Sequence, residues 1–285
     1  MSYPVRRRMA SLAAALLLLG ATTAAQISAH PANTPSFRII EIPGKSQIFA
    51  RDISNRGAIV GYASDATARQ IGFIKLDRFI GEIDFPNSSL TTAWGINDRG
   101  EIVGSLVGSG YLLSKGEFTL LPGISPESIN DRGDIVGVAA GGRDGFLRTG
   151  DGAFTTIRVP NSNSTRAHGI NDRGQIVGDF EDVSFHERGF LFWGGEFRTI
   201  EVPGSSRTEA IAINNFGQVV GKFVGSDGEQ GFLWRAGKFT TISIPASVTT
   251  NIFGINDRGQ IVGIYVDTSG NEFAFQSHVK EFLEH

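Results

Sequence analysis

Cysteine is absent from this chain of 285 residues, and its two methionines, Met1 and Met9, both stand close to the N-terminus. Without cysteine there are no disulfides, thiolate nucleophiles or cysteine-ligated metals. Positive charge is also scarce, because 26 Lys and Arg face 29 Asp and Glu, so we expect no nucleic-acid partner. Beyond an N-terminal apolar run, no segment shows a 3.6-residue apolar period, which predicts almost no helix.

The one long apolar run covers residues 12–19. Three consecutive arginines at 6–8 precede it, and small residues with cleavage points after Ala25 or Ala29 follow it. This order is typical of a secretory signal peptide, and the run is too short for a spanning anchor, which is the alternative interpretation. We therefore expect export by either the general secretory or the twin-arginine route.

The chain is thus divided into a signal peptide at 1–29, a linker at 30–36 and a single repeat domain at 37–285. Removing the three signal-peptide arginines changes the formal net charge from −3 to −6. We predict a secreted or periplasmic protein with no stable membrane insertion after signal removal.

Glycine is abundant, with 37 copies, and part of it marks a repeated turn. The turn follows the pattern Ile-Asn-Asp-Arg-Gly, and we call each copy an anchor. The six anchors begin at Ile53, Ile96, Ile129, Ile170, Ile213 and Ile255. Their final glycines are spaced 43, 33, 41, 43 and 42 residues apart, a period typical of β-propeller blades.

Each unit contains four short strand patterns: one ending at the anchor, one beginning directly after it, a Gly-Phe-Leu strand and an alternating strand before proline. Residues 37–43 match the fourth pattern but precede every first strand. Residues 280–283 match it weakly and compete for the same place. We predict an all-β, six-bladed β-propeller of four-stranded blades, with the N-terminal strand completing the last blade because closure removes exposed sheet edges.

The string Gly-Ile-Asn-Asp-Arg-Gly-Gln-Ile-Val-Gly at 169–178, followed by a Gly-Phe-Leu strand, resembles the bacterial extracellular HAF-repeat family. The resemblance covers about residues 37 to 276 and implies a secreted or surface protein of β-propeller type. The family brings no settled activity and no catalytic residues. The His-Ala-Phe signature itself is absent, since one third strand reads Glu272-Phe273-Ala274, and the fifth anchor departs at Asn215-Phe216.

The repeated Asn and Asp of the anchors offer oxygen ligands for calcium, but each turn has a single carboxylate and the first and fifth have none. No D-x-D-x-D-G string and no G-x-x-x-x-G-K-[ST] loop occurs. We interpret the anchors as structural turns, and we expect no metal and no cofactor.

Function is sought where the copies differ, because a common scaffold explains only what they share. The position two residues before each anchor isoleucine varies most, and it holds Arg51, Trp94, Glu127, His168, Ile211 and Phe253. Further variation lies two residues earlier, with Arg166 and Glu209, and in loops before the third strand, with Arg143, His186 and Arg188. We place these residues at the mouth of the central channel.

Two functions remain open. The preferred one is a non-enzymatic binding module that presents one loop face to an extracellular glycan, small molecule or protein, with Arg51, Trp94, Arg166, Arg143, His186 and Arg188 as ligand-binding candidates. The alternative is a carbohydrate-active enzyme, a polysaccharide lyase or glycosidase. Its acid and base candidates are Glu127, His168 and Glu209, with Arg51 and Arg166 on a substrate carboxylate. A structural envelope protein is a third possibility.

Overall fold

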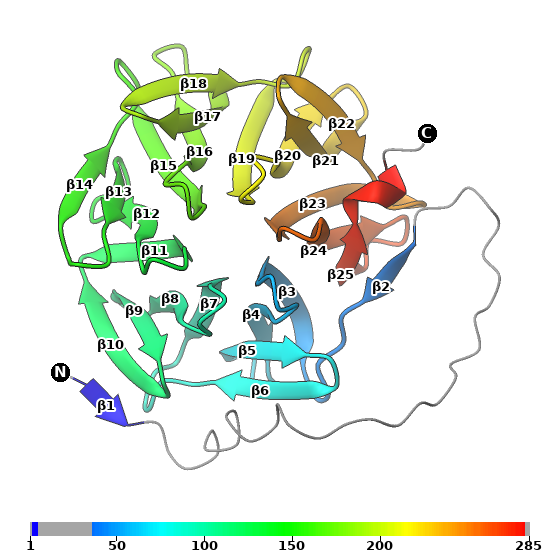
Figure 1. The fold of residues 1–285 in the computed structure, drawn as a ribbon. Helices are drawn as coiled ribbons and strands as arrows, with labels where there is room; N and C mark the ends of the chain where they lie inside the picture. The colour runs from blue at the N-terminus through cyan, green and yellow to red at the C-terminus, as the bar shows by residue number, and fades with distance from the viewer. Residues whose placement is uncertain (1, 5–35, 283–285) are drawn as a thin grey trace.

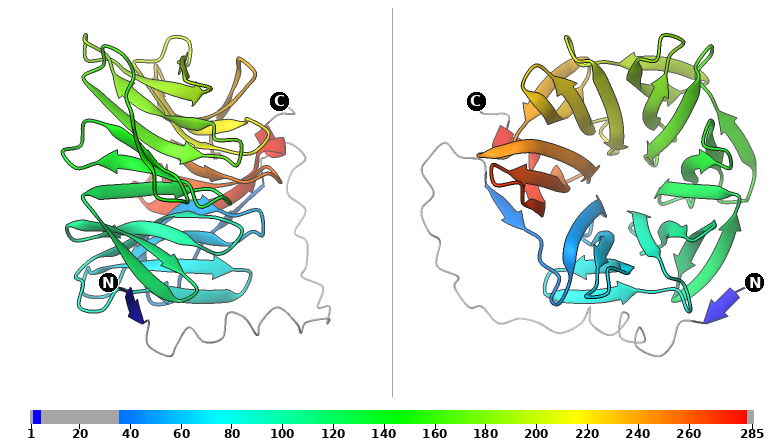
Figure 2. Two further views of the ribbon diagram at one scale, coloured as in Figure 1. Left: turned by 60° about the vertical axis from the view of Figure 1, so that its left-hand side comes forward. Right: turned by 180° about the vertical axis from the view of Figure 1, so that it is seen from behind.

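The computed structural model describes residues 2–4 and 36–282, and the arrangement there is all-β. Sheets radiate from a central axis as in a β-propeller, seen from the front and from behind (Figures 1 and 2). Within the described residues there is no α-helix, only the 3-10 helix η2 at Val279–Phe282. The predicted signal peptide and linker lie outside them, apart from Ser2–Pro4 and Ser36.

In the part of the chain that the structure describes, no helix is long and apolar enough to cross a membrane.

The strands form five hydrogen-bonded sheets. One contains β3 (Ser46–Ile53), β4 (Ile59–Ser64), β5 (Gln70–Leu76) and β6 (Phe79–Ile83). The next contains β7 (Thr91–Ile96), β8 (Ile102–Leu106), β9 (Ser109–Ser114), β10 (Glu117–Pro122) and the short β1 (Ser2–Pro4). A third contains β11 (Ile124–Ile129), β12 (Ile135–Ala139), β13 (Gly145–Arg148) and β14 (Phe154–Ile157).

An eight-stranded sheet follows. Its first half is β15 (Ser164–Ile170), β16 (Ile176–Glu181), β17 (Glu187–Trp193) and β18 (Glu196–Ile200). Its second half is β19 (Arg207–Ile213), β20 (Val219–Gly225), β21 (Gly228–Arg235) and β22 (Lys238–Ile242). The last sheet is β23 (Ser247–Ile255), β24 (Gln260–Asp267), β25 (Glu272–His278) and β2 (Phe37–Ile39).

The propeller arrangement of four-stranded sheets agrees with the prediction, but six separate sheets are not formed. The difference lies between β17 and β19, where a single parallel pair, Glu187 with Arg207, joins two sets of four strands. Both residues carry long charged side chains that form an ion pair of 2.6 Å. This contact draws the two strands together at one end.

The N-terminal strand closes the ring, as the pattern at 37–43 predicts. β2 pairs antiparallel with β25, and the N–H of Ile40 continues the ladder to the carbonyl of Ala274 at 2.8 Å. The described part of the competing segment, residues 280–282, does not form that strand and lies in η2 instead. Residues 37–39 therefore cover an edge that β25 would otherwise expose.

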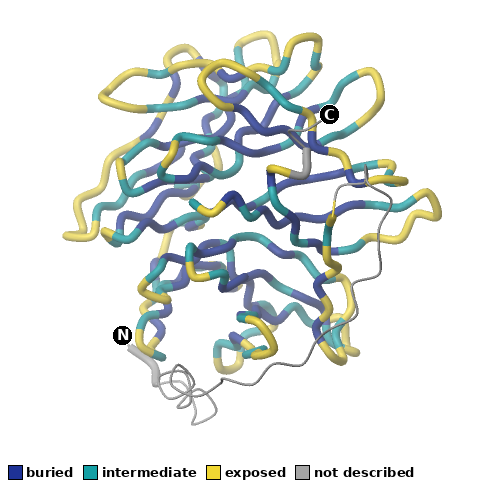
Figure 3. Tube along the Cα trace, turned by 45° about the vertical axis from the view of Figure 1, so that its right-hand side comes forward, coloured by how far each residue is buried: buried dark blue, intermediate teal, exposed yellow. Residues whose placement is uncertain are grey.

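The core lies between neighbouring sheets, and the repeated aromatic residue of the third strand is at its centre. The six copies are at most 2% exposed: Phe73, Tyr111, Phe146, Phe190, Phe232 and Phe275. Phe190, for example, packs with Ile157 of the preceding sheet in one cluster. Figure 3 shows burial along the strands and exposure in the loops. Burying one such ring contributes about 2–3 kcal/mol.

Each innermost strand has a register shift at the residue two before its anchor isoleucine. The bulged residue has no partner on the next strand, and a bulge turns its side chain away from the regular alternation. The bulged residues are Arg51, Trp94, Glu127, His168, Ile211 and Phe253, which we call the bulge column.

The bulge explains the glycine of the repeated Ile-Val-Gly strand. A Cβ at Gly178 would lie 1.8 Å from the carbonyl oxygen of Arg166 and 2.8 Å from Cε1 of Phe190. The equivalent glycine of every repeat would meet a carbonyl at 1.8–2.0 Å. Only glycine lets the two strands approach this closely.

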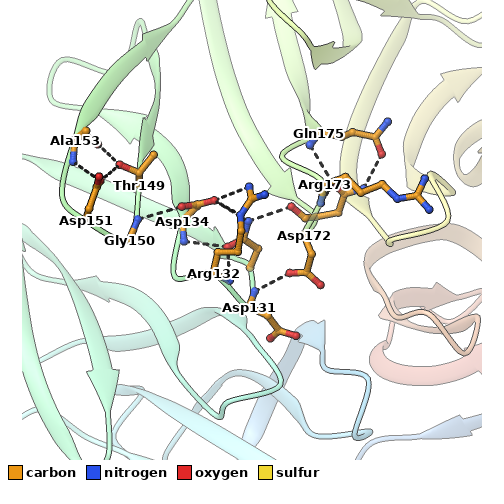
Figure 4. Close-up of polar contacts among 12 residues, drawn as sticks. Asp131, Arg132, Asp134, Thr149, Gly150, Asp151, Ala153, Asp172, Arg173 and Gln175 are labelled. Carbon is orange, nitrogen blue, oxygen red and sulfur yellow. Dashed lines mark hydrogen bonds and ion pairs between the residues drawn. The ribbon is translucent and has the colours of Figure 1, made fainter.

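The anchors of neighbouring sheets are hydrogen-bonded into a closed ring, part of which appears in Figure 4. In each link a backbone N–H donates to a side-chain oxygen of the next anchor at 2.7–2.8 Å. The order is Asn55, Asp98, Asp131, Asp172, Asn215, Asp257 and back to Asn55. The last link joins residues 202 positions apart. The anchor carboxylates thus serve the fold.

A second set of links uses the preceding asparagine. In five anchors its Nδ2 donates to the backbone carbonyl of the next anchor at 3.0–3.1 Å. The first anchor has Ser54 at this position. There, Oδ2 of Asp52 instead accepts the N–H of Ile96 from the next sheet at 3.0 Å, while its Oδ1 accepts the N–H of Ile53. Burial raises the pKa of Asp52 to about 6.

Gly178→Ala should lower the free energy of unfolding by about 3 kcal/mol, because the new methyl group overlaps backbone that cannot move independently. Gly81→Ala is the matched control, since its Cβ would meet only side-chain atoms, at 3.2 Å or more. Urea-induced unfolding measures both, and equal costs in the two variants would contradict the explanation.

Asp131 tests the anchor ring. Burial, and then the nearby charges of Asp172 and Asp98, raise the pKa of Asp131, so its ionised form opposes folding as the pH rises through its titration range. Asp131→Asn keeps the acceptor oxygen and should be neutral or stabilising by up to about 1 kcal/mol, with a flatter pH dependence. Asp131→Ala leaves the N–H of Asp98 without its acceptor and should cost about 1–3 kcal/mol. Thermal unfolding across pH distinguishes them; equal destabilisation by both would refute this account.

Candidate functional site

The bulge column lines a pocket on the central axis, which we call the axial pocket. Its cavity volume is about 90 Å³. All six bulged side chains contribute to its wall, and the anchor ring lines it as well, through residues such as Asp98 and Asp131. The pocket therefore combines a variable wall with a repeated one.

Arg51 is held between two aromatic rings of the bulge column. Its guanidinium carbon lies 4.2 Å from the ring centroid of Trp94 and 4.1 Å from that of Phe253. Tyr62 supports Trp94 at 5.8 Å and stacks on Phe49 at 4.8 Å. Cation–π attraction and these packed rings fix the plane of the guanidinium.

His168 lies between two carboxylates. Its Nδ1 is 2.5 Å from Oε2 of Glu127, and its Nε2 contacts Oδ1 of Asp179. Burial opposes protonation, but the charges of Glu127 and Asp179 outweigh it and raise the pKa of His168 to about 10. The two carboxylates therefore favour the protonated imidazole at neutral pH, and this form has no free lone pair with which to accept a proton.

A chain of ion pairs continues from this histidine across the strands from β15 to β21. Arg166 contacts Asp179 at 2.9 Å and also pairs with Glu187. Acidic and basic side chains then alternate, and the remaining members are Arg207, Glu209, Lys222 and Glu229. Glu209 is thus paired with Arg207 and lies 3.5 Å from Lys222.

Four of the predicted site residues meet in the axial pocket: Arg51, Trp94, Glu127 and His168. Arg166 and Glu209 belong to the chain of ion pairs and do not line the pocket.

The three loop candidates also lie outside the wall of the axial pocket. Arg143 precedes β13, and His186 is 61% exposed in its side chain. Arg188 lies on β17 and pairs with Asp182 and Glu201. Residues near the second and third strands are farther from the axis than the innermost strand, so the loops do not reach the wall.

Asp179 was missed by the sequence reasoning, although it holds both His168 and Arg166. It follows the glycine of the Ile-Val-Gly strand, at a position that also varies among repeats. The other copies there are Tyr62, Ser105, Val138, Lys222 and Ile264. That variation was a signal, since two of the six side chains carry charge.

Among the described residues, no group of three or more His, Asp or Glu is arranged to hold a metal ion. The anchor oxygens are used in hydrogen bonds between sheets, as in the links to Asp172 and Asp257.

No protein-family model and no curated protein matches this sequence. Among solved structures, it is similar to the β-propeller domain of the Trilobed protease from Pyrococcus furiosus, with TM-score 0.54, 14% identity, and 83% and 82% of the two chains covered. A catalytically inactive virginiamycin B lyase from Staphylococcus aureus with quinupristin gives TM-score 0.53, 14% identity and 83% of each chain. A gluconolactonase from Xanthomonas campestris gives 0.51, 11%, and 88% and 99%. These likenesses show a β-propeller fold alone.

The protonation of His168 is directly testable. Its imidazole nitrogens should keep both protons through neutral pH in NMR spectra, because two carboxylates hold the charge. The raised pKa stabilises the fold fully below about pH 6.5, and this contribution is lost as the pH rises toward about 10. His168→Gln should cost about 3 kcal/mol at neutral pH and remove that pH dependence. Deprotonation of His168 near pH 7 would contradict the assignment.

Proposed function

We propose that this protein is a secreted, non-enzymatic binding module that holds an extracellular glycan, small molecule or protein at the axial pocket and the loop face around it. The observation that carries the proposal is that the acid and base candidates are already engaged. The two ring N–H groups of His168 donate to Glu127 and to Asp179, and Glu209 is paired with Arg207.

A binding role needs a fixed shape more than a free proton acceptor. The closed anchor ring and the fully buried third-strand aromatic residues supply rigidity. The aromatic rings of Trp94 and Phe253 hold the guanidinium of Arg51 in one plane. A preformed site of this kind loses little conformational entropy on binding.

We further propose that the propeller has six blades, that the protein is a member of the HAF-repeat family, and that the signal peptide at 1–29 directs its export. Six anchors support the blade number, as do the two sets of four strands in the eight-stranded sheet, β15–β18 and β19–β22. The repeat strings support the family, and the arginines at 6–8 before the apolar run at 12–19 support export.

The alternative is a polysaccharide lyase or glycosidase that uses the same pocket. It is favoured by the presence of Glu127, His168 and Arg51 in one pocket wall. In this alternative, Glu127 would need to leave His168 before it could exchange a proton with a substrate.

Binding and turnover are separated by testing one variant, Glu127→Gln with Glu209→Gln, on a glycan array and in depolymerisation assays. The module predicts no turnover by the wild type and binding that survives within about tenfold, since neither carboxylate performs chemistry. Glu196→Gln, at an exposed position of β18, is the matched charge control.

Circular dichroism and thermal unfolding of the double variant check that the fold is kept. If the wild type depolymerises a glycan and the double variant does not, the binding-module proposal is overturned in favour of the carbohydrate-active enzyme. The absence of both binding and turnover would overturn the two together.

A further inference from the structure

We propose that the axial pocket recognises a carboxylate group on its ligand, which accepts hydrogen bonds from the guanidinium of Arg51 and the indole N–H of Trp94. This inference rests on the proposed binding function and names the chemical class of the ligand. It concerns the two hydrogen-bond donors of the bulge column that have no acceptor among the described residues.

Arg51 differs from the other cations near the pocket. Arg166, Arg207, Lys222 and His168 each contact at least one carboxylate. Within the described residues, Arg51 has no hydrogen-bond acceptor and no ion-pair partner; its contacts are the rings of Trp94 and Phe253. The aromatic rings offer the guanidinium no hydrogen-bond acceptor, and Arg51 lines the axial pocket, where its N–H groups can meet a ligand.

The nearest acidic side chains are occupied elsewhere. Both oxygens of Asp52 accept backbone N–H groups, from Ile53 and Ile96. Glu127 is held by His168. Burial lowers the pKa of Arg51, so a ligand carboxylate would restore compensation of its charge that water no longer supplies.

Trp94 provides an independent observation. Its Nε1 is buried and has no hydrogen-bond partner, although the side chain lines the axial pocket. A buried donor without a partner costs about 1–3 kcal/mol, so such groups in folded proteins require an explanation. A ligand acceptor that reaches Nε1 from the axial pocket would remove this cost, and Arg51 lies 4.2 Å from the same ring.

The pocket favours a singly charged, planar acceptor over a phosphate. A carboxylate matches the two parallel N–H groups of a guanidinium. The anchor ring places Asp98, Asp131, Asp172 and Asp257 in the same pocket. These four carboxylates repel an anion in proportion to its charge, which disfavours a dianion more strongly. Ile211 adds an apolar wall for the body of the ligand.

The test uses five probes with the wild-type protein: acetate, benzoate, glucuronate, the neutral isostere glucuronamide and inorganic phosphate. Two-dimensional NMR follows the Nε–H signal of Arg51 and the indole Nε1–H signal of Trp94. We expect saturable shifts of both signals with the carboxylates and at least about tenfold weaker binding of glucuronamide, because a charge-assisted hydrogen bond is lost.

Arg51→Gln should weaken glucuronate binding about 10- to 100-fold. Arg51→Lys keeps the charge without the planar fork and should fall between the wild type and Arg51→Gln. Arg38→Gln, on the outer strand β2, is the control that removes one exposed arginine away from the axis. Thermal unfolding of each variant separates lost binding from lost fold.

The wild-type comparison decides the inference even if an Arg51 variant does not fold. Equal binding of glucuronate and glucuronamide would overturn the carboxylate while leaving the binding module intact. Tighter binding of inorganic phosphate than of acetate would also overturn it. The inference fails if no carboxylate gives a saturable shift even when its concentration is raised well above millimolar. Glycan-array binding then tests the proposed binding function separately.

Discussion

The hydrogen bond from one anchor N–H to the side-chain oxygen of the next is the interaction on which the rest of the structure depends. Repeated around the axis, it fixes the distance and angle between neighbouring sheets and joins Asp257 to Asn55 across 202 positions of sequence. It also explains the composition of the anchors. Four aspartates in one ring repel each other, and the amides of Asn55 and Asn215 donate to neighbouring carboxylates. The two departures from aspartate thus reduce the electrostatic cost of the ring.

The bulges build a variable site on this constant frame. A regular strand would alternate its side chains between the two neighbouring sheets, where the core requires apolar residues of defined size. A bulged residue such as His168 or Arg51 is removed from that alternation and lines the pocket instead. Gly178 and its equivalents make the bulge sterically possible. What the repeats share is therefore set by strand packing, whereas the residues that differ between them are the bulged ones that line the pocket.

Much of the fold follows from short-range patterns. The anchors, the third-strand aromatic residues and the early strand at 37–39 predict the propeller arrangement and its closure, because each is a local signal repeated along the chain. The pairing of Glu187 with Arg207 was not predictable, since it depends on how the first residues of β17 and β19 approach in space.

The site was predictable in part. Spacing from the anchor places Arg51, Trp94, Glu127 and His168 in one pocket. It does not show that Asp179 on the neighbouring strand stabilises the protonated form of His168, because that requires the cross-strand register. It also treats Arg188 as equivalent to Arg51, although one lies on the third strand and the other on the first. The distance of a residue from the axis depends on the three-dimensional fold, and the type of the residue does not predict it.

The bulge column has a consequence for divergence. Since none of its six residues has a cross-strand partner, replacing one changes the lining of the pocket without altering any backbone pairing. The column behaves like a set of variable positions on a fixed frame, as hypervariable loops do on a rigid scaffold, although its side chains contact one another, as Arg51 does Trp94. Duplicated genes that encode this frame can therefore diversify in specificity through substitutions at these six positions, all of which line the axial pocket.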